Sequence, residues 1–163
     1  MELSIASREQ LSIIRDLAYQ IWPDTYGATH TKEELDYMLT KFYAIESLEN
    51  QCSKGHIFIL AADNGVNIGF ASYEINSENS SKTKIHKLYV LPEIQGKGIG
   101  KALVDYIKKE ALSHNNTALF LNVNKLNKAQ KFYQYYGFSI TKDIIIDIGN
   151  GFVMDDYVME ENL

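Results

Sequence analysis

The hydrophobic pattern of this chain changes from a helical to a strand-like period at about residue 55, and this change limits the folds that are open to it. Before it, Ser7-Arg8-Glu9-Gln10 and Thr31-Lys32-Glu33-Glu34 have the form of capping boxes, and each precedes apolar residues with helical spacing. After it, apolar runs bounded by turn residues alternate with two more helical segments. The order β-α-α-β-β-β-α-β-α-β-β predicts an α/β fold in which about four helices cover a mixed, mostly antiparallel sheet.

The boundaries of the expected elements follow from the residues that end each pattern. Pro23 and Gly27 are expected to end the first helix at about Ile21. The Asn64-Gly65 pair predicts a hairpin turn, and residues 76–82 are expected to form an exposed loop. Strands are expected over 3–5, 56–62, 67–75, 85–91, 117–124, 140–148 and 152–159, and helices over 7–21, 31–42, 99–107 and 127–136.

Composition excludes several classes of protein. The 163 residues fit one domain, 1–163, and carry 16 basic against 21 acidic side chains, a net charge of −5. Nucleic-acid binding through a basic surface is therefore not expected. The single Cys52 excludes an intramolecular disulfide, and no apolar run approaches the ~20 residues of a membrane helix. Because Met1 opens no recognisable leader, the expectation is a cytoplasmic protein without membrane association.

The most informative segment is the glycine-rich stretch VLPEIQGKGIGK, from Val90 to Lys101, where a strand ends and a helix starts. Glycines allow tight bends and a close approach of backbone amides to a ligand, and a helix N-terminus favours an anion. The segment therefore predicts a phosphate cradle, to which Lys97 and Lys101 add positive charge. A P-loop would need Gly and Ser or Thr where Gln95 and Ala102 stand, and the spacing also departs from the dinucleotide-binding Gly-x-Gly-x-x-Gly. The alternative is that the glycines only shape a tight connection.

Two motifs carry a resemblance to a known family. Gln95-Gly96-Lys97-Gly98-Ile99-Gly100 resembles the acetyl-CoA pyrophosphate loop of the GNAT N-acetyltransferase superfamily. The segment from Asn127 to Phe138 is similar to a second signature of this family, and the order of elements matches over essentially the whole chain. More loosely, the two N-terminal helices and Met154-Asp155-Asp156-Tyr157-Val158-Met159 resemble bacterial polyamine (spermidine- and spermine-type) N-acetyltransferases. The resemblance implies direct transfer of an acetyl group from acetyl-CoA to a primary amine.

The same resemblance implies which residues bind acetyl-CoA. In this family the backbone of the strand before the loop pairs with the pantetheine arm, although the same residues would serve equally well as a core strand. Asn127 is expected beside the cofactor and is also an apt helix N-cap, with Gln130 completing a capping box. The expected cofactor-binding residues are Leu88, Tyr89, Val90, Gln95, Gly96, Lys97, Gly98, Ile99, Gly100, Lys101, Asn127 and Tyr133.

Tyr133 is expected to be a catalytic residue, because it matches the family position of the general acid for the departing thiolate. It also belongs to an apolar stripe with Phe132 and Tyr136, which is the structural alternative. Unperturbed pKa values are about 10 for Tyr and about 8.5 for a thiol, so the proton transfer is slightly uphill. Tyr133 must therefore be tuned, helped by water or limited to hydrogen bonding.

A proton acceptor is also needed, because a primary ammonium group with a pKa of about 10.4 is mostly charged at neutral pH. His86 is the candidate general base: strand alternation places it on one face with Leu88 and Val90, and its unperturbed pKa of about 6.5 suits the task. The family often has a carboxylate there, so a packed or hydrogen-bonded histidine is the alternative. Glu74 on a neighbouring strand is the reserve, acting through water.

The acceptor pocket of this family is built from the first two helices and the last strands, which here offer aromatic and acidic side chains. These suit a cationic amine through ion pairs and cation–π contacts, so a small polyamine-like acceptor is expected. Aminoglycosides, amino acids and protein amino groups are alternatives, as is a non-catalytic acyl-CoA sensor. The expected substrate-binding residues are Trp22, Tyr26, Tyr37 and Glu74, and the same regions also supply Asp24, Glu33, Glu34, Asp36, Asp155, Asp156 and Tyr157.

No metal site is expected, because His30, His56 and His114 are scattered without ligand spacing. Cys52 has no adjacent base that would make it a nucleophile. Dimers are common in the family, so a homodimer is one expectation for the assembly.

Overall fold

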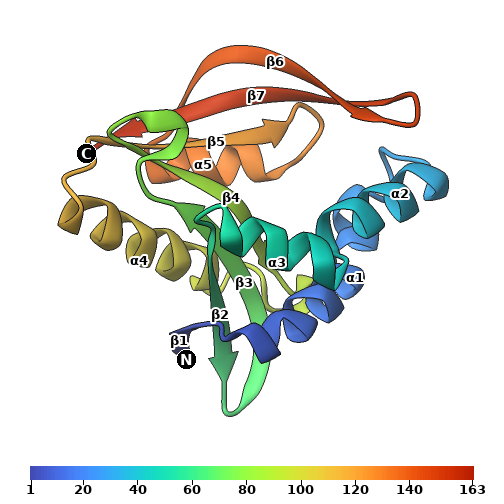
Figure 1. The fold of residues 1–163 in the computed structure, drawn as a ribbon, viewed down its shortest axis with the longest axis horizontal. Coiled ribbons are helices and arrows are strands. Elements are labelled where there is room, and N and C mark those ends of the chain that lie inside the picture. The colour runs from blue at the N-terminus through green and yellow to red at the C-terminus, as the bar shows by residue number, and fades with distance from the viewer.

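The computed structural model describes residues 1–163, and its centre is one seven-stranded sheet. The strands lie in the order β1-β2-β3-β4-β5-β7-β6 (Figure 1). All neighbours pair antiparallel except β4 and β5, which pair parallel and are joined by a helical crossover. The strands are β1 (Glu2–Ile5), β2 (Ile57–Asp63), β3 (Val66–Glu74), β4 (Lys82–Val90), β5 (Ala118–Asn124), β6 (Ser139–Gly149) and β7 (Phe152–Asn162).

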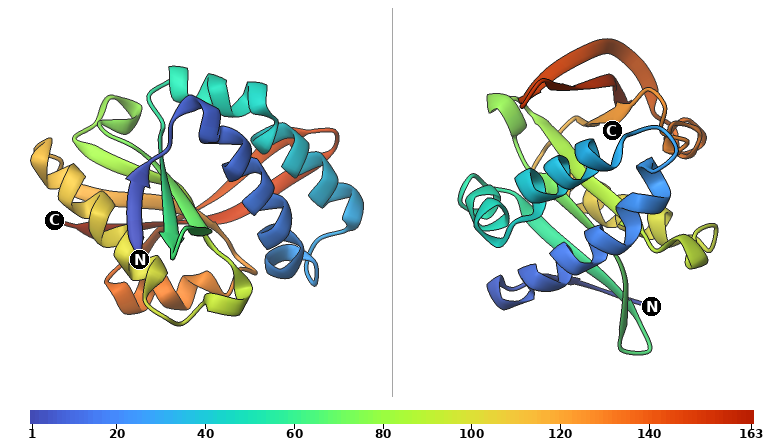
Figure 2. Two further views of the ribbon diagram at one scale, coloured as in Figure 1. Left: turned by 90° about the horizontal axis from the view of Figure 1, so that it is seen from below. Right: turned by 90° about the vertical axis from the view of Figure 1, so that its right-hand side faces the viewer.

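Five helices cover the two faces of this sheet. Helices α1, α2 and α3 lie on one face, and α4 and α5 lie on the other (Figure 2). The helices are α1 (Leu11–Tyr26), α2 (Lys32–Tyr43), α3 (Ile45–Ser53), α4 (Ile99–Ser113) and α5 (Ala129–Tyr136). The predicted α/β fold with a mixed, mostly antiparallel sheet is confirmed, with one helix more than expected.

The N-terminal helices differ from the sequence expectation in two places. Helix α1 continues through Pro23 to Tyr26, so the expectation that Pro23 ends it is wrong. Burial of Trp22 and Tyr26 on the apolar face of this last turn offsets the hydrogen bond that a proline removes. Helix α3 was not expected, because Leu48 is its only buried residue and its apolar pattern is too sparse to mark a helix.

Two apolar clusters hold the helices against the sheet, one on each face. The cluster beneath α4 and α5 includes Ile59 from β2, Ala71 from β3 and Ile107 from α4. The cluster beneath α1, α2 and α3 includes Phe58 and Phe70, which neighbour Ile59 and Ala71 in sequence. Adjacent strand residues therefore face opposite clusters, which is why β2 and β3 read as nearly continuous apolar runs.

Strands β4 and β5 separate partway along their length. They pair from Lys82 opposite Ala118 to Ile85 opposite Leu121, and beyond these residues the two strands no longer bond to each other. β4 continues to Val90 on its own, bonded only to β3 on its other side. The backbone edges of both strands are thus free along the opening between them.

A β-bulge lies in β4 at the start of this opening. Tyr73 of β3 pairs with Ile85, and the neighbouring Ser72 pairs with Lys87, so His86 is the extra residue on β4. A bulge bends the strand and changes the direction of its side chains, and bulges are common beside active sites. The bulge therefore marks this point of the sheet for closer inspection.

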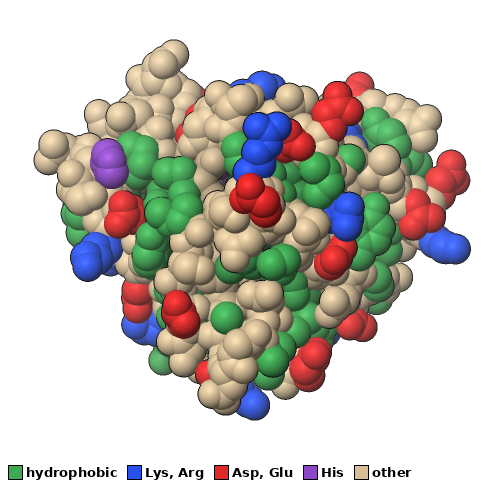
Figure 3. All heavy atoms as spheres, turned by 60° about the horizontal axis from the view of Figure 1, so that its bottom comes forward, with side chains coloured by type: hydrophobic (Ala, Val, Ile, Leu, Met, Phe, Trp, Pro, Cys, Tyr) green, Lys and Arg blue, Asp and Glu red, His purple; other side chains and the backbone are tan.

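None of the helices combines the length and the apolar character that crossing a membrane requires. On the face shown in Figure 3, acidic and basic side chains are interspersed with apolar ones rather than gathered by sign.

Candidate active site

The opening between β4 and β5 leads into a cavity of about 370 Å³. Its walls come from both strands, from α1, α2 and α3 on one side, from α5 on the other, and from β6 and β7 at the far edge. Such a mixture of apolar walls and a few polar groups is typical of small-molecule sites. The polar lining residues are Tyr26, His30, Tyr43, Gln51, His56, Lys84, His86, Lys87, Tyr89, Asn122, Asn124, Asn127, Tyr133 and Asp156.

The glycine-rich loop has the backbone geometry of a phosphate cradle at the start of α4. Gly96 and Gly98 have φ angles of 81° and 83°, which residues other than glycine rarely adopt. The amides from Gly96 to Lys101 donate no hydrogen bond within the protein, and the first bond of α4 runs from Ala102 N to Gly98 O. A run of free amides at a helix N-terminus fits an anionic phosphate group.

Gly100 has a different role from the two glycines before it. A Cβ atom at Gly100 would lie 3.3 Å from Cζ of Phe132, so the missing side chain allows α4 to approach α5. Ile99 beside it is buried in the cluster beneath α4. Gly100 therefore serves the packing of the strand–helix connection, whereas the phosphate-binding geometry depends on Gly96 and Gly98.

The polar side chains of the loop are engaged within the protein or exposed. Gln95 Nε2 donates to Val90 O at 3.1 Å and ties the loop to the end of β4. Lys101 Nζ lies 2.8 Å from Asp105 Oδ2 on the surface of α4, and Lys97 is exposed. Both lysines stand close to the free amides of the helix N-terminus, a position that favours an anion.

The free edge of β4 lies where a ligand in the opening would run. Leu88 and Tyr89 line the cavity, and Val90 is buried beneath α4. On the other side these residues pair with β3, Leu88 opposite Ala71 and Val90 opposite Gly69. Main-chain groups on the open side therefore have no strand to bond to.

Asn127 links the opening to the aromatic wall of the cavity. Its Oδ1 accepts a hydrogen bond from Ala129 N at 2.8 Å, and its Nδ2 group donates to Tyr26 Oη at 3.4 Å. Tyr26 Oη also lies 2.9 Å from Tyr89 Oη, which completes a short polar chain. The expected capping box does not form, because Gln130 Nε2 binds two carbonyl groups that precede Asn127 instead.

Tyr133 lies on α5 and lines the cavity, with 6% of the residue exposed. Its ring packs edge-on against Phe132 and Phe138, so the apolar stripe and the cavity position coexist. Burial, reinforced by Tyr26, raises the pKa of Tyr133 well above its usual range. The hydroxyl is therefore protonated at neutral pH and has no partner within the protein.

Strand alternation does not carry through the bulge, so the expectation that His86 shares a face with Leu88 and Val90 is wrong. Leu88 and Val90 pack into the cluster beneath α4 and α5. His86 instead stacks on His56 and bonds to Glu74, on the face that α1, α2 and α3 cover. The bulge shifts the alternation by one residue at this position.

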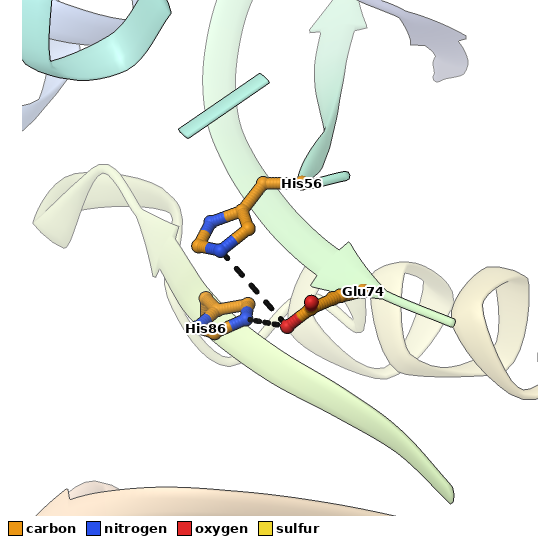
Figure 4. Close-up of side chains that lie close together, drawn as sticks. All are labelled: His56, Glu74 and His86. Carbon is orange, nitrogen blue, oxygen red and sulfur yellow. Dashed lines mark hydrogen bonds and ion pairs between the residues drawn. The ribbon is translucent and has the colours of Figure 1, made fainter. Parts of the chain in front are cut away.

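His56, Glu74 and His86 form a compact cluster at the cavity wall (Figure 4). His86 Nε2 lies 3.0 Å from Glu74 Oε1, and His56 Nε2 lies 4.0 Å from the same oxygen. The two imidazole rings are stacked, with centroids 3.8 Å apart and planes 14° apart. Figure 4 shows a nitrogen of each ring directed at the carboxylate of Glu74.

Both imidazoles of the cluster are neutral at pH 7. Burial and the neighbouring His56 lower the pKa of His86 to about 3, and burial and Lys87 lower the pKa of His56 to about 4. Burial alone would raise the pKa of Glu74, but hydrogen bonds from His86 and Ser77 outweigh it and the net pKa is lowered. The cluster therefore carries one negative charge, on Glu74.

Two imidazoles and one carboxylate within 4.8 Å of one another also make up a donor set that binds Zn²⁺ in proteins. Sequence spacing missed this group, because the three residues come from different segments of the sheet. The positive charges of Lys84 and Lys87, which help to lower both imidazole pKa values, oppose a divalent cation as well. The neutral imidazoles and the ionised carboxylate are nevertheless the protonation states that a metal ion requires of its ligands.

Asp156 is a cavity residue that the sequence pattern did not distinguish from the other acidic residues near it. It lies on β7 opposite Asn124, lines the cavity, and is 5% exposed. Burial and the neighbouring Asp155 raise the pKa of Asp156 to about 6. A cavity carboxylate with such a pKa suits proton transfer near neutral pH. The available signal was its period-two placement between the apolar Met154 and Val158.

Of the four expected acceptor residues, two line the cavity, and Tyr37 and Glu74 do not. Trp22 and Tyr26 line it, side by side with ring centroids 4.7 Å apart. Tyr37 is outside the lining: its hydroxyl donates to Ile148 O at 2.5 Å and its ring packs on Phe152. Tyr37 therefore fastens α2 to the β6–β7 hairpin.

The acid-rich lining that the sequence suggested does not form. Glu74 contacts the cavity wall through His86 and His56 without lining it, and Asp156 is the one carboxylate among the lining residues. Lys84 and Lys87 line the same cavity. The ionisable groups on the walls thus include two ammonium groups against one carboxylate.

Comparison with known proteins places this geometry in a family. Residues 15–138 match the family model described as Acetyltransferase (GNAT) family. The solved structure of the PaiA N-acetyltransferase from Thermoplasma acidophilum, in complex with coenzyme A, is similar over 100% of both chains, with a TM-score of 0.81 and 25% identity.

Sequence relatives point the same way. The chain is 25% identical over 146 residues to the spermidine N(1)-acetyltransferase of Thermoplasma acidophilum. The aligned region covers 86% of this chain and 89% of that protein. It is 34% identical over 80 residues to an uncharacterized N-acetyltransferase of Archaeoglobus fulgidus, a match that spans 46% of this chain and about half of that protein, 54%. Together with the family match, the chain therefore belongs to the acetyltransferase (GNAT) family and is an acetyl-CoA-dependent N-acetyltransferase.

Proposed function

We propose that this enzyme, folded as one domain of residues 1–163, transfers the acetyl group to a primary amine of a small acceptor bound in the β4–β5 cavity. The observation that carries the proposal is the path from the free amides of the glycine loop, along the open edge of β4, to a cavity lined by Tyr133 and Asp156. Strands from both ends of the chain share the sheet, which supports a single domain.

The residues along this path fit acetyl-CoA, which supplies the activated acetyl thioester when it is bound. The free amides from Gly96 to Lys101 suit its pyrophosphate, and the open edge of Leu88–Val90 suits its pantetheine arm. Asn127 lies beside the same opening. The coenzyme A complex of the Thermoplasma acidophilum relative supports this assignment.

Gly98→Ala is expected to weaken acetyl-CoA binding by about 10-fold, because a side chain at a φ of 83° costs about 1–2 kcal/mol. The loop relieves this strain by turning its amides away from the phosphate. Calorimetric titration with coenzyme A measures the change. Gly65→Ala is the matched control: Gly65 has a φ of 77° in the β2–β3 turn and, like Gly98, an open space where a Cβ would stand. An equal loss of affinity in both variants would contradict the cradle.

We assign the general base to Asp156, with the His86–Glu74 pair as the second candidate. Asp156 has no ion pair or hydrogen bond, and its pKa of about 6 leaves it ionised and ready to accept a proton at neutral pH. His86 is neutral but, with a pKa of about 3, a far weaker base. His86 and Glu74 then shape the polar wall beside the acceptor.

His86→Ala is expected to lower kcat several-fold, the effect of one lost hydrogen bond, without moving the rise in rate near pH 6. The pH dependence of kcat, measured side by side for the wild type and the variant, checks this. Disappearance of that rise in His86→Ala would transfer the role of general base to His86.

Two classes of acceptor have support of different kinds. A polyamine is supported by the spermidine N(1)-acetyltransferase relative and by the aromatic pair Trp22 and Tyr26. The charges of the lining, with Lys84 and Lys87 against Asp156, support an amine that also carries an acidic group. Amino acids with a primary amine are therefore the second candidate class.

Release of free thiol from acetyl-CoA with a panel of amines tests the proposed function. The panel contains spermidine, spermine, lysine, an aminoglycoside and simple alkyl amines. Acetylation of at least one small amine is the expected result. Tight coenzyme A binding without thiol release for any of them would instead indicate a non-catalytic acyl-CoA sensor.

A further inference from the structure

Lys87 is a half-buried residue at the cavity wall, and its ammonium group has no carboxylate partner. Its Nζ donates to Gln51 Oε1 at 2.8 Å and lies 5.3 Å and 5.9 Å from the ring centroids of Tyr43 and Phe58. Gln51 is held in place because its Nε2 donates to Phe42 O at 3.0 Å. An ammonium group has three donors, and only one of them has an acceptor in the protein.

The ammonium group of Lys87 is thus partly removed from water and lacks a counter-ion. Buried charges in proteins are normally paired, because removing a charge from water without a counter-ion is strongly unfavourable. Burial and the neighbouring Lys84 lower the pKa of Lys87 to about 8, which leaves it mostly charged at neutral pH. The protein therefore maintains a positive charge at a cavity wall whose own residues do not neutralise it.

Neutral polar atoms without hydrogen-bond partners gather around the same end of the cavity. Trp22 Nε1, Tyr43 Oη and His56 Nδ1 are buried and make no hydrogen bond. All three residues line the cavity together with Lys87. Burial and nearby Tyr26 raise the pKa of Tyr43 well above its usual range against the opposing effect of the Trp22 indole, so its hydroxyl is protonated. The ammonium group of Lys87 beside two neutral donors, the Trp22 N–H and the Tyr43 O–H, matches a group with a single negative charge.

The cavity thus has two polar ends of opposite sign. Asp156 on β7 has no cationic partner, and Lys87 on β4 has no anionic one. We infer that the acceptor is an amino acid type of molecule whose carboxylate binds Lys87 while its primary amine lies at Asp156. This inference rests on the proposed function and specifies the substrate class of the same site.

The distance between the two ends selects the kind of amino acid. Strand β5 lies between β4 and β7, and neighbouring strands are about 4.8 Å apart, so Lys87 and Asp156 belong to strands about 10 Å apart or more in the separated region. An α-amino acid carries both groups on one carbon, so its amine and carboxylate are much closer together than these two strands. An ω-amino acid, with several methylene groups between amine and carboxylate, spans them.

Three amines of equal chain length test the inference: ε-aminocaproate, hexamethylenediamine and n-hexylamine. They differ only in bearing a carboxylate, a second ammonium group or a methyl group at the far end. Thiol release at varied amine concentration gives kcat/KM for each. The expected order is ε-aminocaproate above n-hexylamine, with hexamethylenediamine lowest because Lys87 repels its second charge.

Lys87→Met is expected to lower kcat/KM for ε-aminocaproate by about 10- to 100-fold and to leave n-hexylamine within about 3-fold. Lys87→Arg keeps the charge and is expected to recover part of the loss. Lys82→Met is the control on the same strand: Lys82 pairs with Glu160 outside this cavity, and all three amines are expected to keep their wild-type values.

The outcomes separate the inference from the proposed function. Equal kcat/KM for ε-aminocaproate and n-hexylamine, or equal losses of both in Lys87→Met, overturns the carboxylate site while thiol release still supports acetyl transfer. If no amine releases thiol, the proposed function fails, and calorimetric titration of ε-aminocaproate into wild type and Lys87→Met in the presence of coenzyme A still decides the site. Binding that depends on Lys87 supports it, and absence of that dependence overturns it.

Discussion

Asp156→Asn is expected to lower kcat by about 10²- to 10⁴-fold while acetyl-CoA affinity stays within about 3-fold. The carboxylate of Asp156 is the one acidic group in the cavity lining, and the amide has the same shape but cannot take up a proton at neutral pH. Wild-type kcat is expected to rise with pH through about 6, as Asp156 ionises, and then to level off. The variant loses this rise.

The choice of acceptor distinguishes a lost base from a damaged site. An alkyl amine of low basicity is already neutral at the pH of the assay, so no base is required to remove its proton. Asp156→Asn is expected to acetylate such an amine at nearly the wild-type rate and a strongly basic amine of the same shape far more slowly. Equal losses with both amines would contradict the role of general base.

The same substitution is expected to stabilise the fold. Because the pKa of Asp156 is raised to about 6, its ionisation costs stability as pH rises from its unfolded value of about 3.9 through about 6. Below that window the carboxyl group is neutral in both states and the cost vanishes. Asp156→Asn should therefore raise the free energy of unfolding by on the order of 2 kcal/mol above pH 6, and change it little in acid. Urea unfolding at two pH values measures both.

Much of the fold follows from local patterns in the sequence. Helix α2 opens at the predicted capping box, where Glu34 N donates to Thr31 Oγ1 at 3.1 Å. Strands β2 and β3 form where the apolar runs predicted them. Both faces of these strands are covered by helices, so apolar residues occupy successive positions along them. Helix α3 was not predicted because Leu48 is its only buried residue. A single buried residue gives no repeating apolar pattern from which a helix could be recognised.

The site was predictable only where one segment forms it. The glycine loop is contiguous, so Gly96 and Gly98 could be identified from their positions between a strand and a helix. The direction of His86 depends on a bulge, which is a matter of register between β3 and β4 and leaves no mark in either strand alone. The environment of Asp156 likewise depends on strands distant in sequence. Burial shifts its pKa, and burial is a property of the folded chain.

Tyr133→Phe is expected to lower kcat by about 10²- to 10³-fold, the usual effect of removing one donor to the charge that develops in the transition state. The raised pKa of Tyr133 makes complete proton transfer to a thiolate, whose conjugate acid has a pKa of about 8.5, strongly unfavourable. Its contribution is therefore a hydrogen bond from a hydroxyl that no protein group occupies. Stopped-flow or steady-state thiol release measures the loss.

The structure also says what this substitution should leave unchanged. The ring of Tyr133 keeps its edge-on contacts with Phe132 and Phe138. The hydroxyl has no hydrogen-bond partner in the protein, so its removal leaves no group unpaired. Thermal stability and coenzyme A affinity are therefore expected to stay close to wild type. An acyl donor with a more acidic leaving thiol needs less help in departing and should lose less in Tyr133→Phe. Unchanged kcat with acetyl-CoA would show that Tyr133 takes no part in the reaction and serves only in packing. A loss of kcat that becomes smaller as the leaving thiol becomes more acidic would show that the hydroxyl donates to the departing sulfur.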